Sequence, residues 1–345
     1  MGALLRALLI QKMATSLNWT DLSRTGYEAL TQGNFDRAEQ LFRRAIDHLG
    51  FEQEDLRLAY SFLVLGRCLS QKGDWTGAEP MYKKALEIYE KVHGAVHEDV
   101  AFSLAGQAKC KLQSNQFEPA ANLYRRALTI YEKLKGPEHE DVANMLDNLG
   151  QAYMAQREYE KAITNYDRAA KIFSKVRSPF DEKVADILFS LGRCHDELNE
   201  DKQAAQIFHR ALEIYEQQSE PDREQLANCQ YNLARCYQGL REFLKAEPLY
   251  RKSLDYFLKS KDKQLERSAA YCTFALATCY MVSGDYRAEE HLKKAKALYE
   301  KIFGPNHLQT AYLLEAYSRL LGNTCRAHEA KKLEEKAKEI RDKFA

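Results

Sequence analysis

Alanine recurs along this chain at a nearly constant interval, and this period constrains the fold more than any other feature. The first interval is 40 residues and each later one is 42 residues, which gives the ladder Ala38, Ala78, Ala120, Ala162, Ala204, Ala246, Ala288 and Ala330. A fixed period of this size is the signature of an array of structural repeats. Because repeat arrays usually present a binding surface, the period also favours binding over catalysis.

Within one repeat, the apolar residues follow two successive helical faces. In the repeat that begins near Val142, Leu146, Leu149 and Tyr153 share one face of a first helix. After a polar break, Ala162 begins a second amphipathic series that continues to residue 173. Each repeat is therefore predicted to be a helix-turn-helix unit.

We predict an all-α, right-handed α-solenoid of about eight such units. Residues 1–19 are expected to form an N-terminal extension, helical or disordered, and residues 20–345 the repeat array. The predicted units cover about 20–56, 57–97, 98–139, 140–181, 182–223, 224–265, 266–307 and 308–345.

Small residues and glycines recur with the same period. Gly26, Gly66, Gly150 and Gly192 each lie twelve residues before a ladder alanine, which predicts a close approach of the two helices of a unit. Gly94, Gly136 and Gly304 lie where helix C-caps prefer glycine.

The last two units depart from this plan. The seventh has lost one residue, since Tyr280 precedes its alanine by eight residues instead of nine. The eighth has Glu334 and Arg341 where other units have aromatic residues, and such a polar last helix is typical of a terminal cap at which an array ends.

Composition excludes several classes of function. The 51 basic and 50 acidic residues nearly balance, so no nucleic-acid or anionic-membrane partner is indicated. The apolar run near the N-terminus is interrupted by Arg6 and is too short to insert across a membrane. Equivalent cysteines in successive repeats are too far apart for disulfides and predict buried packing residues in a reducing, cytoplasmic compartment: Cys68, Cys110, Cys194, Cys236 and Cys279.

The residue pattern of each unit resembles the tetratricopeptide repeat. It consists of Gly or Ala, a large residue three positions later, then Ala-x3-Phe/Tyr-x2-Ala, and finally Pro. The longer unit, with Ala78-Glu79-Pro80-Met81-Tyr82 and Gly136-Pro137-Glu138-His139, resembles the kinesin-light-chain type. Asn148-Leu149-Gly150 and Asn232-Leu233-Ala234 match the asparagine-leucine motif of that family. The resemblance covers about residues 20–345 and implies peptide or protein binding, with the first helices lining a concave face.

No residue pattern indicates catalysis, a cofactor or a metal. His97, His139 and His307 occupy equivalent loop positions about one repeat apart or more, so they cannot share an ion and are expected to form loop hydrogen bonds. His195 occupies the position of Tyr153 in its own unit and is expected to pack there. The sequence contains no phosphate-binding loop, no G-x-S-x-G and no H-E-x-x-H. We therefore expect a non-catalytic protein.

Eleven residues before the ladder alanines lies a row that is mostly basic. Its members Arg67, Lys109, Arg193 and Arg235 would place cations along the concave face, where they would favour an acidic segment. The row is interrupted by Gln151 and, in the shortened seventh unit, by Thr278, which lies ten residues before its alanine. The alternative is an ordinary solvated face with ion pairs inside its own helices.

Polar and aromatic residues flank this row. Asn144 with Asn148 and Asn228 with Asn232 form i,i+4 pairs, and an amide can both donate to and accept from an extended peptide backbone. In the unit between them the equivalent pair is Asp186 with Ser190. Aromatic residues, among them Phe189 and Tyr231, could hold an apolar anchor of the ligand. Surface polarity without a special role is the alternative for the asparagines, and packing is the alternative for the aromatic rings.

The sequence thus predicts a monomeric cytoplasmic adaptor that binds an extended acidic peptide between about Asn144 and Arg235. One alternative is a structural subunit that joins a stable complex through its convex surface or its ends. Another is a kinesin-light-chain-like subunit that binds cargo, although no sustained heptads precede the first repeat.

Overall fold

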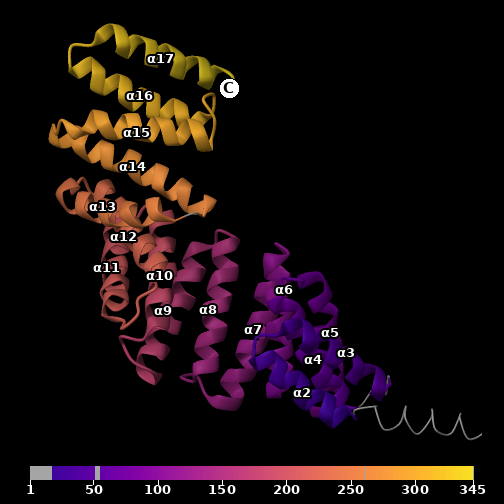
Figure 1. Cartoon of the computed structure of the whole chain (residues 1–345). Coiled ribbons are helices and arrows are strands. Elements are labelled where there is room, and N and C mark those ends of the chain that lie inside the picture. Colours follow the sequence, from indigo (N-terminus) through magenta and orange to yellow (C-terminus); the bar gives the residue numbers. More distant parts are fainter. Residues whose placement is uncertain (1–17, 51–54, 261, 345) are drawn as a thin grey trace, which may run out of the picture. The chain divides into compact units, whose positions relative to one another are not determined.

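The computed structural model describes residues 18–50, 55–260 and 262–344, which form sixteen α-helices and no β-strand (Figure 1). This confirms the predicted all-α class and the helical hairpin as its repeating element. Nearly all of the predicted N-terminal extension, residues 1–19, lies outside the described residues. The chain divides into two compact units, Met1–Arg177 and Ser178–Ala345, called unit 1 and unit 2 below.

Unit 1 contains four helical hairpins, in which each first helix packs against the second helix that follows it. The hairpins are α2 (Trp19–Thr31) with α3 (Phe35–Leu49), α4 (Leu56–Gln71) with α5 (Trp75–His93), α6 (Glu98–Gln113) with α7 (Phe117–Lys135), and α8 (Glu140–Ala155) with α9 (Tyr159–Val176).

Unit 2 repeats this arrangement with four more hairpins. They are α10 (Glu182–Glu197) with α11 (Asp201–Gln217), α12 (Arg223–Gly239) with α13 (Phe243–Lys259), α14 (Lys263–Ser283) with α15 (Arg287–Ile302), and α16 (Leu308–Asn323) with α17 (Ala327–Asp342).

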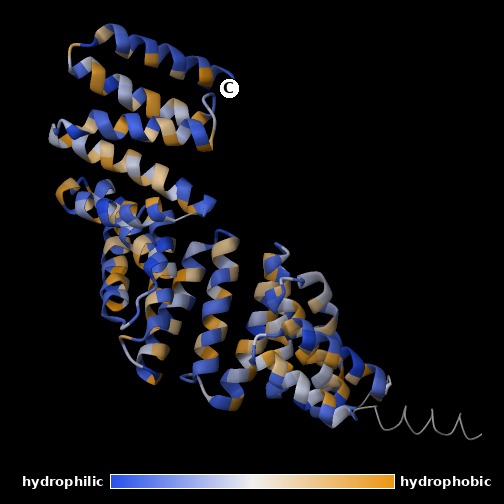
Figure 2. Ribbon diagram, in the orientation of Figure 1, coloured by the Kyte–Doolittle hydropathy of each residue, from blue (hydrophilic) through white to orange (hydrophobic). Residues whose placement is uncertain are grey.

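The first helices of neighbouring hairpins also contact one another in each unit, for example α4 with α6 and α12 with α14. The second helices are further apart, since the contacts between hairpins otherwise join a second helix to the next first helix. We call the exposed side of the first helices the inner face and that of the second helices the outer face. Apolar residues lie on the sides of the helices that meet, and polar residues on the sides that face solvent (Figure 2).

The ladder alanines lie in the interior of both units, and all eight are buried. The predicted glycine contacts are confirmed, because a Cβ on Gly26, Gly150 or Gly192 would lie only 2.7–2.8 Å from a ring atom of Phe42, Tyr166 or Phe208. These aromatic residues stand four positions after ladder alanines. Glycine on the first helix therefore makes room for the ring from the second.

Side chains at the N-caps determine where the first helices begin. The Nδ1 atoms of His97, His139 and His307 accept the backbone N–H two residues on, at 3.2, 3.1 and 3.1 Å, as the prediction of loop hydrogen bonding requires. Aspartate or asparagine caps the other first helices: Asn18, Asp55, Asp181, Asp222 and Asp262. Each cap satisfies one of the backbone donors that a helix leaves free, so helix starts are fixed locally.

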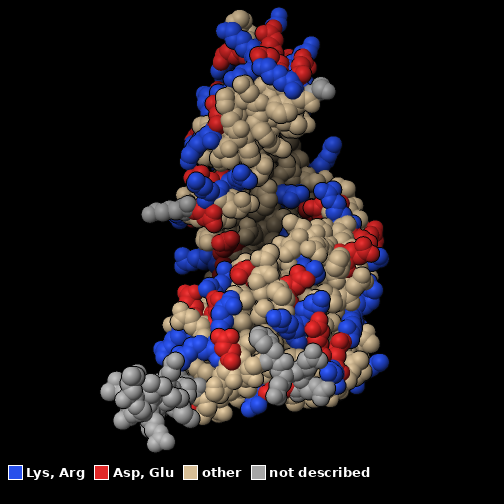
Figure 3. All heavy atoms as spheres, turned by 90° about the vertical axis from the view of Figure 1, so that its right-hand side faces the viewer, with Lys and Arg blue, Asp and Glu red and all other residues tan. Residues whose placement is uncertain are grey.

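The last two hairpins differ as the sequence indicated. The shortened turn of the seventh passes through Gly284, whose φ of 68° lies in the left-handed region, and α15 begins without a side-chain cap. Charged residues of both signs cover α17 at the top of Figure 3, and an almost uncharged area lies below them.

Ion pairs join neighbouring second helices on the outer face of unit 1. Arg126 of α7 pairs with Glu90 of α5, and Arg168 of α9 pairs with Glu132 of α7 at 2.7 Å. These glutamates lie twelve residues after their ladder alanines, and the arginines lie six residues after theirs. The same two repeat positions therefore connect three successive second helices across the outer grooves.

Candidate functional site

The predicted binding residues divide between the two units, which are described separately. Unit 1 contributes Arg67, Lys109, Asn144 and Asn148. Unit 2 contributes seven residues from α10 and α12, two helices in contact with each other: Phe189, Ser190, Arg193, Asn228, Tyr231, Asn232 and Arg235.

Cations and aromatic rings alternate on the inner face of unit 1. The half-buried Arg67 holds its guanidinium 5.9 Å from the ring centroid of Phe102, and the exposed Lys109 holds its ammonium 5.8 Å from that of Trp75. Such cation–π contacts favour one side-chain orientation and leave the charge accessible. Both cations could therefore contact a ligand, and Phe102 offers exposed ring surface beside them.

The asparagine pair on α8 is available for hydrogen bonding. Asn144 and Asn148 are half-buried, and within the described ranges neither side chain has a hydrogen bond. Gln151 differs, since its amide donates to Asp147 at 3.2 Å. Each free asparagine amide offers donors and an acceptor to a peptide backbone.

On α10 and α12, two of the predicted polar residues are already hydrogen-bonded within their own helices. Asn232 donates to the carbonyl oxygen of Asn228 at 2.8 Å, and the Ser190 hydroxyl donates to that of Asp186 at 3.1 Å. The carbonyl oxygen of the Asn232 side chain and the whole Asn228 amide are left for a ligand. Unit 2 thus offers fewer donors than the sequence pattern alone indicates.

The two arginines of unit 2 have different surroundings. Arg193 is exposed and has no ion pair within the part of the chain that the structure describes. Arg235 pairs with Asp196 of α10 at 3.1 Å. Burial raises the pKa of the Asp196 carboxyl above its ordinary value, while the charge on Arg235 opposes the rise. Of these two arginines, Arg193 is therefore the one without an ion pair in the described structure, and Arg235 also ties α12 to α10.

The aromatic residues near this site contribute to packing. Phe189 lies 5.7 Å from Phe208, and Tyr231 lies 5.9 Å from Tyr250, measured between ring centroids. Burial raises the pKa of Tyr231 to about 12. Both side chains are only half-buried, so the same rings that fill the hairpin interior also present an edge to solvent.

Two clusters bring possible metal ligands within 4.8 Å of one another: His93 with His97 and Asp99, and Asp196 with Asp201 and Cys236. In the first, the imidazoles stack nearly parallel with centroids 4.0 Å apart, and the Nδ1 of His97 already caps α6. In the second, Asp196 pairs with Arg235, and burial raises the pKa of the Cys236 thiol to about 12. Both clusters therefore contain side chains that already have structural partners.

His195 has a structural partner. Its Nδ1 lies 2.5 Å from a carboxylate oxygen of Glu200, and Lys111 donates to Gln116 at 3.1 Å in the same two positions of the third hairpin. The contact joins the end of a first helix to the turn that follows it. This half-buried position agrees with the packing role predicted for His195.

Sequence comparison gives the family of these hairpins. A tetratricopeptide repeat profile matches residues 55–133, 141–217, 202–259 and 267–343, and a second one matches residues 106–175. The chain belongs to the tetratricopeptide repeat family. Among curated proteins, no sequence matches it.

Solved structures agree with this tetratricopeptide fold. BtubC (BKLC) from P. vanneervenii is 22% identical, with a TM-score of 0.54 over 64% of this chain and 87% of that one. Repeats of a Podosopora anserina protein assigned as a kinesin light chain are 19% identical, with a TM-score of 0.51 over 58% of this chain and 95% of that one. Both structures therefore share the tetratricopeptide fold of this chain.

A further structural relative covers more of this chain. The STAND protein PH0952 from Pyrococcus horikoshii, which has a tetratricopeptide repeat sensor, is 18% identical, with a TM-score of 0.67 over 82% of this chain and 41% of that one. At such identities the likeness concerns the fold.

Two features of the tetratricopeptide array are absent from the predictions made from its sequence. One is the ion pair between Arg235 and Asp196. Asp196 lies three residues after Arg193 and partly neutralises the basic row. The other is the pair of repeat positions on the outer face that carry the Glu–Arg ion pairs of unit 1. The two positions of these ion pairs can be found in the sequence, because they lie six and twelve residues after each ladder alanine.

Two further observations concern a membrane span and the cysteines. No described helix combines the length and the apolar character needed to cross a membrane. All eight cysteines are unpaired, and the five predicted to be packing residues are buried, which confirms their assignment. The tetratricopeptide interior uses cysteine as a small apolar residue.

Proposed function

We propose that this protein is a non-catalytic adaptor whose inner face binds an extended, acidic segment of a partner protein. The observation that carries the proposal is Arg193, an exposed cation with no ion pair among the described residues. Its helix α10 contacts α12, the helix that carries Asn228 and Arg235. Membership of the tetratricopeptide repeat family supports a protein partner.

Each residue type would have a separate role. Asn228 and the Asn232 carbonyl oxygen would contact the ligand backbone, because amides bond a peptide without selecting its side chains. Arg193 would pair with a ligand carboxylate, and the exposed edges of Phe189 and Tyr231 would contact an apolar side chain. In unit 1, Lys109, Arg67 and the α8 asparagines offer the same chemistry.

Charge-reversal variants test the electrostatic part. Peptide arrays supply an acidic hit, and its affinity is then measured for the full chain with Arg193→Glu and with Arg235→Glu. We expect each change to weaken binding about tenfold or more, and higher salt to weaken binding to the unmodified chain. Arg210→Glu is the matched control, since this exposed arginine on α11 also has no ion pair within the described ranges.

Two outcomes would contradict the proposal. Affinities that stay the same after both inner-face reversals, and that do not depend on salt, would exclude an acidic ligand at this face. An equal loss with Arg210→Glu would show that only net charge matters. Circular dichroism of each variant separates loss of binding from loss of fold.

We also propose that the protein is cytoplasmic and monomeric. The unpaired, buried cysteines support a reducing compartment. Light scattering during size-exclusion chromatography measures the mass directly, and a multiple of the chain mass would contradict the monomer.

A structural role in a stable complex is the second candidate function. Exposed apolar side chains of unit 2 favour it, since Leu244 and Tyr286 are each 89% exposed. A partner that stays bound at high salt, together with an absence of peptide hits, would favour this role. Co-purification with kinesin heavy chain would instead favour a kinesin-light-chain-like cargo-binding subunit.

A further inference from the structure

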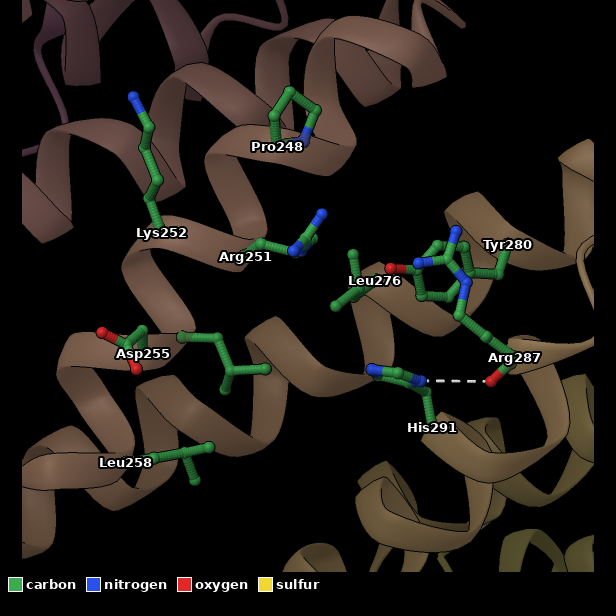
Figure 4. A pocket seen from close by; sticks show the side chains of 10 residues that line it. Pro248, Arg251, Lys252, Asp255, Leu258, Leu276, Tyr280, Arg287 and His291 are labelled. Atoms are coloured by element: carbon green, nitrogen blue, oxygen red, sulfur yellow. Dashed lines mark hydrogen bonds between the residues drawn. The ribbon is translucent and has the colours of Figure 1, made fainter.

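A groove of unit 2 lies on the outer face, away from the proposed peptide site. Its walls are the second helices α13 and α15, and its floor is formed by Leu276 and Tyr280 of α14. The enclosed volume is about 720 Å³, within the usual range of ligand sites. Figure 4 shows Arg251 extending from α13 toward Leu276 and Tyr280, with Arg287 and His291 on the α15 side. We call this the α14 groove.

One repeat position differs at the edge of the α14 groove. Leu258 of α13 lies twelve residues after its ladder alanine, where α5 and α7 carry the glutamates that pair with the next second helix. The basic residue that would meet such a glutamate is Lys294 of α15, and it pairs instead with Glu290 of its own helix at 2.6 Å. Leu258 is 59% exposed and lines the groove.

The shortened seventh repeat orders the opposite wall. Arg287 forms a bidentate pair with Asp285, with an Nη2–Oδ2 distance of 2.6 Å, and its guanidinium lies 4.3 Å from the ring centroid of Tyr280. The Tyr280 hydroxyl donates to Glu247 of α13 at 3.0 Å, which links the floor to the first wall. These contacts hold the wall in place without a ligand.

A smaller groove over α12 allows a comparison of volume, charge and apolar lining with the α14 groove. The equivalent groove over α12 encloses about 350 Å³, and its α11 wall carries Gln206 and His209 where α13 has Pro248 and Arg251. Glu216 occupies the position of Leu258. The α14 groove is thus larger, more basic and more apolar at its edge than its counterpart.

The positive charge of the α14 groove is only partly neutralised. Lys252 has no ion pair within the described residues, and Arg251 is 3.5 Å from Glu247. Asp255, which lines the groove on the α13 wall, already pairs with Lys259 at 2.7 Å. A ligand carboxylate would therefore meet a free cation beside exposed aliphatic surface.

We propose that the α14 groove docks an acidic segment of a partner protein through an aliphatic anchor residue. The anchor packs between Leu258 and Leu276, and carboxylates on either side of it pair with Lys252 and Arg251. This surface is separate from the inner face, so the protein would hold two segments at once, or two parts of one partner.

The probe is a fluorescein-labelled peptide of twelve residues in which a leucine follows every two glutamates, added to the full chain carrying Arg193→Glu. This background suppresses the inner face. We expect Lys252→Glu and Leu258→Asp each to weaken binding about tenfold or more, measured by fluorescence anisotropy. We also expect the peptide to slow hydrogen exchange in α13 and α15.

Matched controls exist for both changes. Leu244→Asp alters another exposed leucine of α13 that does not line the groove, and Lys331→Glu alters an exposed lysine of α17. Both controls should change affinity less than twofold. Because the altered side chains are exposed, the folded state should survive each substitution, and circular dichroism checks this.

Several results would overturn the proposal. One is affinity unchanged by Lys252→Glu and Leu258→Asp, and another is exchange protection confined to α10 and α12. Complete displacement of the peptide by millimolar inorganic phosphate would reduce the groove to a simple anion site. A doubled mass in light scattering that Leu258→Asp abolishes would make a second copy of the chain the occupant. Loss of the proposed inner-face function leaves these measurements unaffected, because they are made with Arg193 already replaced.

Discussion

The outer faces of unit 1 and unit 2 are built from the same repeat, but their second helices are joined differently. In unit 1, Glu90 and Glu132 each pair with an arginine of the next second helix. In unit 2, Leu258 occupies that position on α13, and the α14 groove beside it encloses about 720 Å³. The interiors hardly differ, since the ladder alanines are buried in both units.

This difference separates what makes the fold from what makes a surface. Burial of apolar side chains drives folding, and the same kinds of residue are buried in every hairpin. An exposed ion pair contributes roughly 1 kcal/mol or less to the free energy of unfolding. Replacing one surface glutamate by leucine therefore costs little stability and changes what the groove can bind. Four predictions test this separation, in order of decreasing effect.

The interior should respond alike in both units. Tyr131 of α7 and Phe257 of α13 lie eleven residues after ladder alanines and are 4% and 1% exposed. We expect Tyr131→Ala and Phe257→Ala each to cost about 3–5 kcal/mol, because each leaves a cavity. Urea unfolding followed by hydrogen exchange in each unit measures the loss. Tyr286→Ala is the control at an exposed position, and a cost below about 1 kcal/mol for Phe257→Ala would mean that α13 is packed differently.

Glycines should differ according to what their helix meets. A Cβ on Gly150 would lie 2.7 Å from the Tyr166 ring, whereas one on Gly322 would meet no atom within 4 Å. Gly150→Ala should therefore destabilise unit 1 by about 1–3 kcal/mol through overpacking. Gly322→Ala should stabilise α16 by up to about 1 kcal/mol, since alanine is the better helix former. Thermal unfolding measures both, and equal effects would refute the close approach.

The outer ion pairs should contribute less to the free energy of unfolding than the interior residues tested above. A double-mutant cycle on Glu132→Gln and Arg168→Gln should give a coupling energy of about 0.2–1 kcal/mol. Leu258→Glu, which supplies the acid missing from unit 2, should stabilise α13 and α15 by no more than that and abolish peptide docking in the α14 groove. A coupling energy above about 2 kcal/mol would show that these pairs help to hold the array together.

The smallest effect should come from acid at the end of unit 2. Hydrogen bonds from Lys293 and then Arg326 lower the pKa of Glu289 from its ordinary value of 4.5 to about 2. As pH falls, the unfolded chain takes up this proton first, so the stabilisation is complete above about pH 4.5 and is lost toward pH 2. The opening equilibria of α15 and α17, measured by hydrogen exchange and corrected for the intrinsic pH dependence of amide exchange, should rise by less than about tenfold across this range. Glu289→Gln should remove that dependence, and an unchanged pH profile would contradict it.

The fold could be predicted from the sequence because its causes are local and repeated. Gly150, Ala162 and Tyr166 recur as a set, and together they specify a close pair of helices. The loop histidines were correctly placed because a cap bonds within its own turn. Features such as these depend only on residues close together in the chain.

The candidate site was harder to predict because its charges depend on neighbours in other hairpins. Arg193 and Arg235 look alike in the sequence, yet only Arg235 has an ion pair, with a carboxylate of α10, in the described structure. Asn232 resembles Asn148, but its amide bonds its own helix. Rotamers and contacts between hairpins decide these differences, and repeat periodicity does not specify them.

The missing residue of the seventh repeat has an evolutionary consequence. In a globular core, one deletion shifts packing throughout the domain, but here each hairpin contacts only those beside it. The change is absorbed at Gly284 and reshapes one wall of one groove. A gene for such a chain can therefore revise a single hairpin by deletion or duplication and acquire a new specificity while the ancestral one is kept elsewhere.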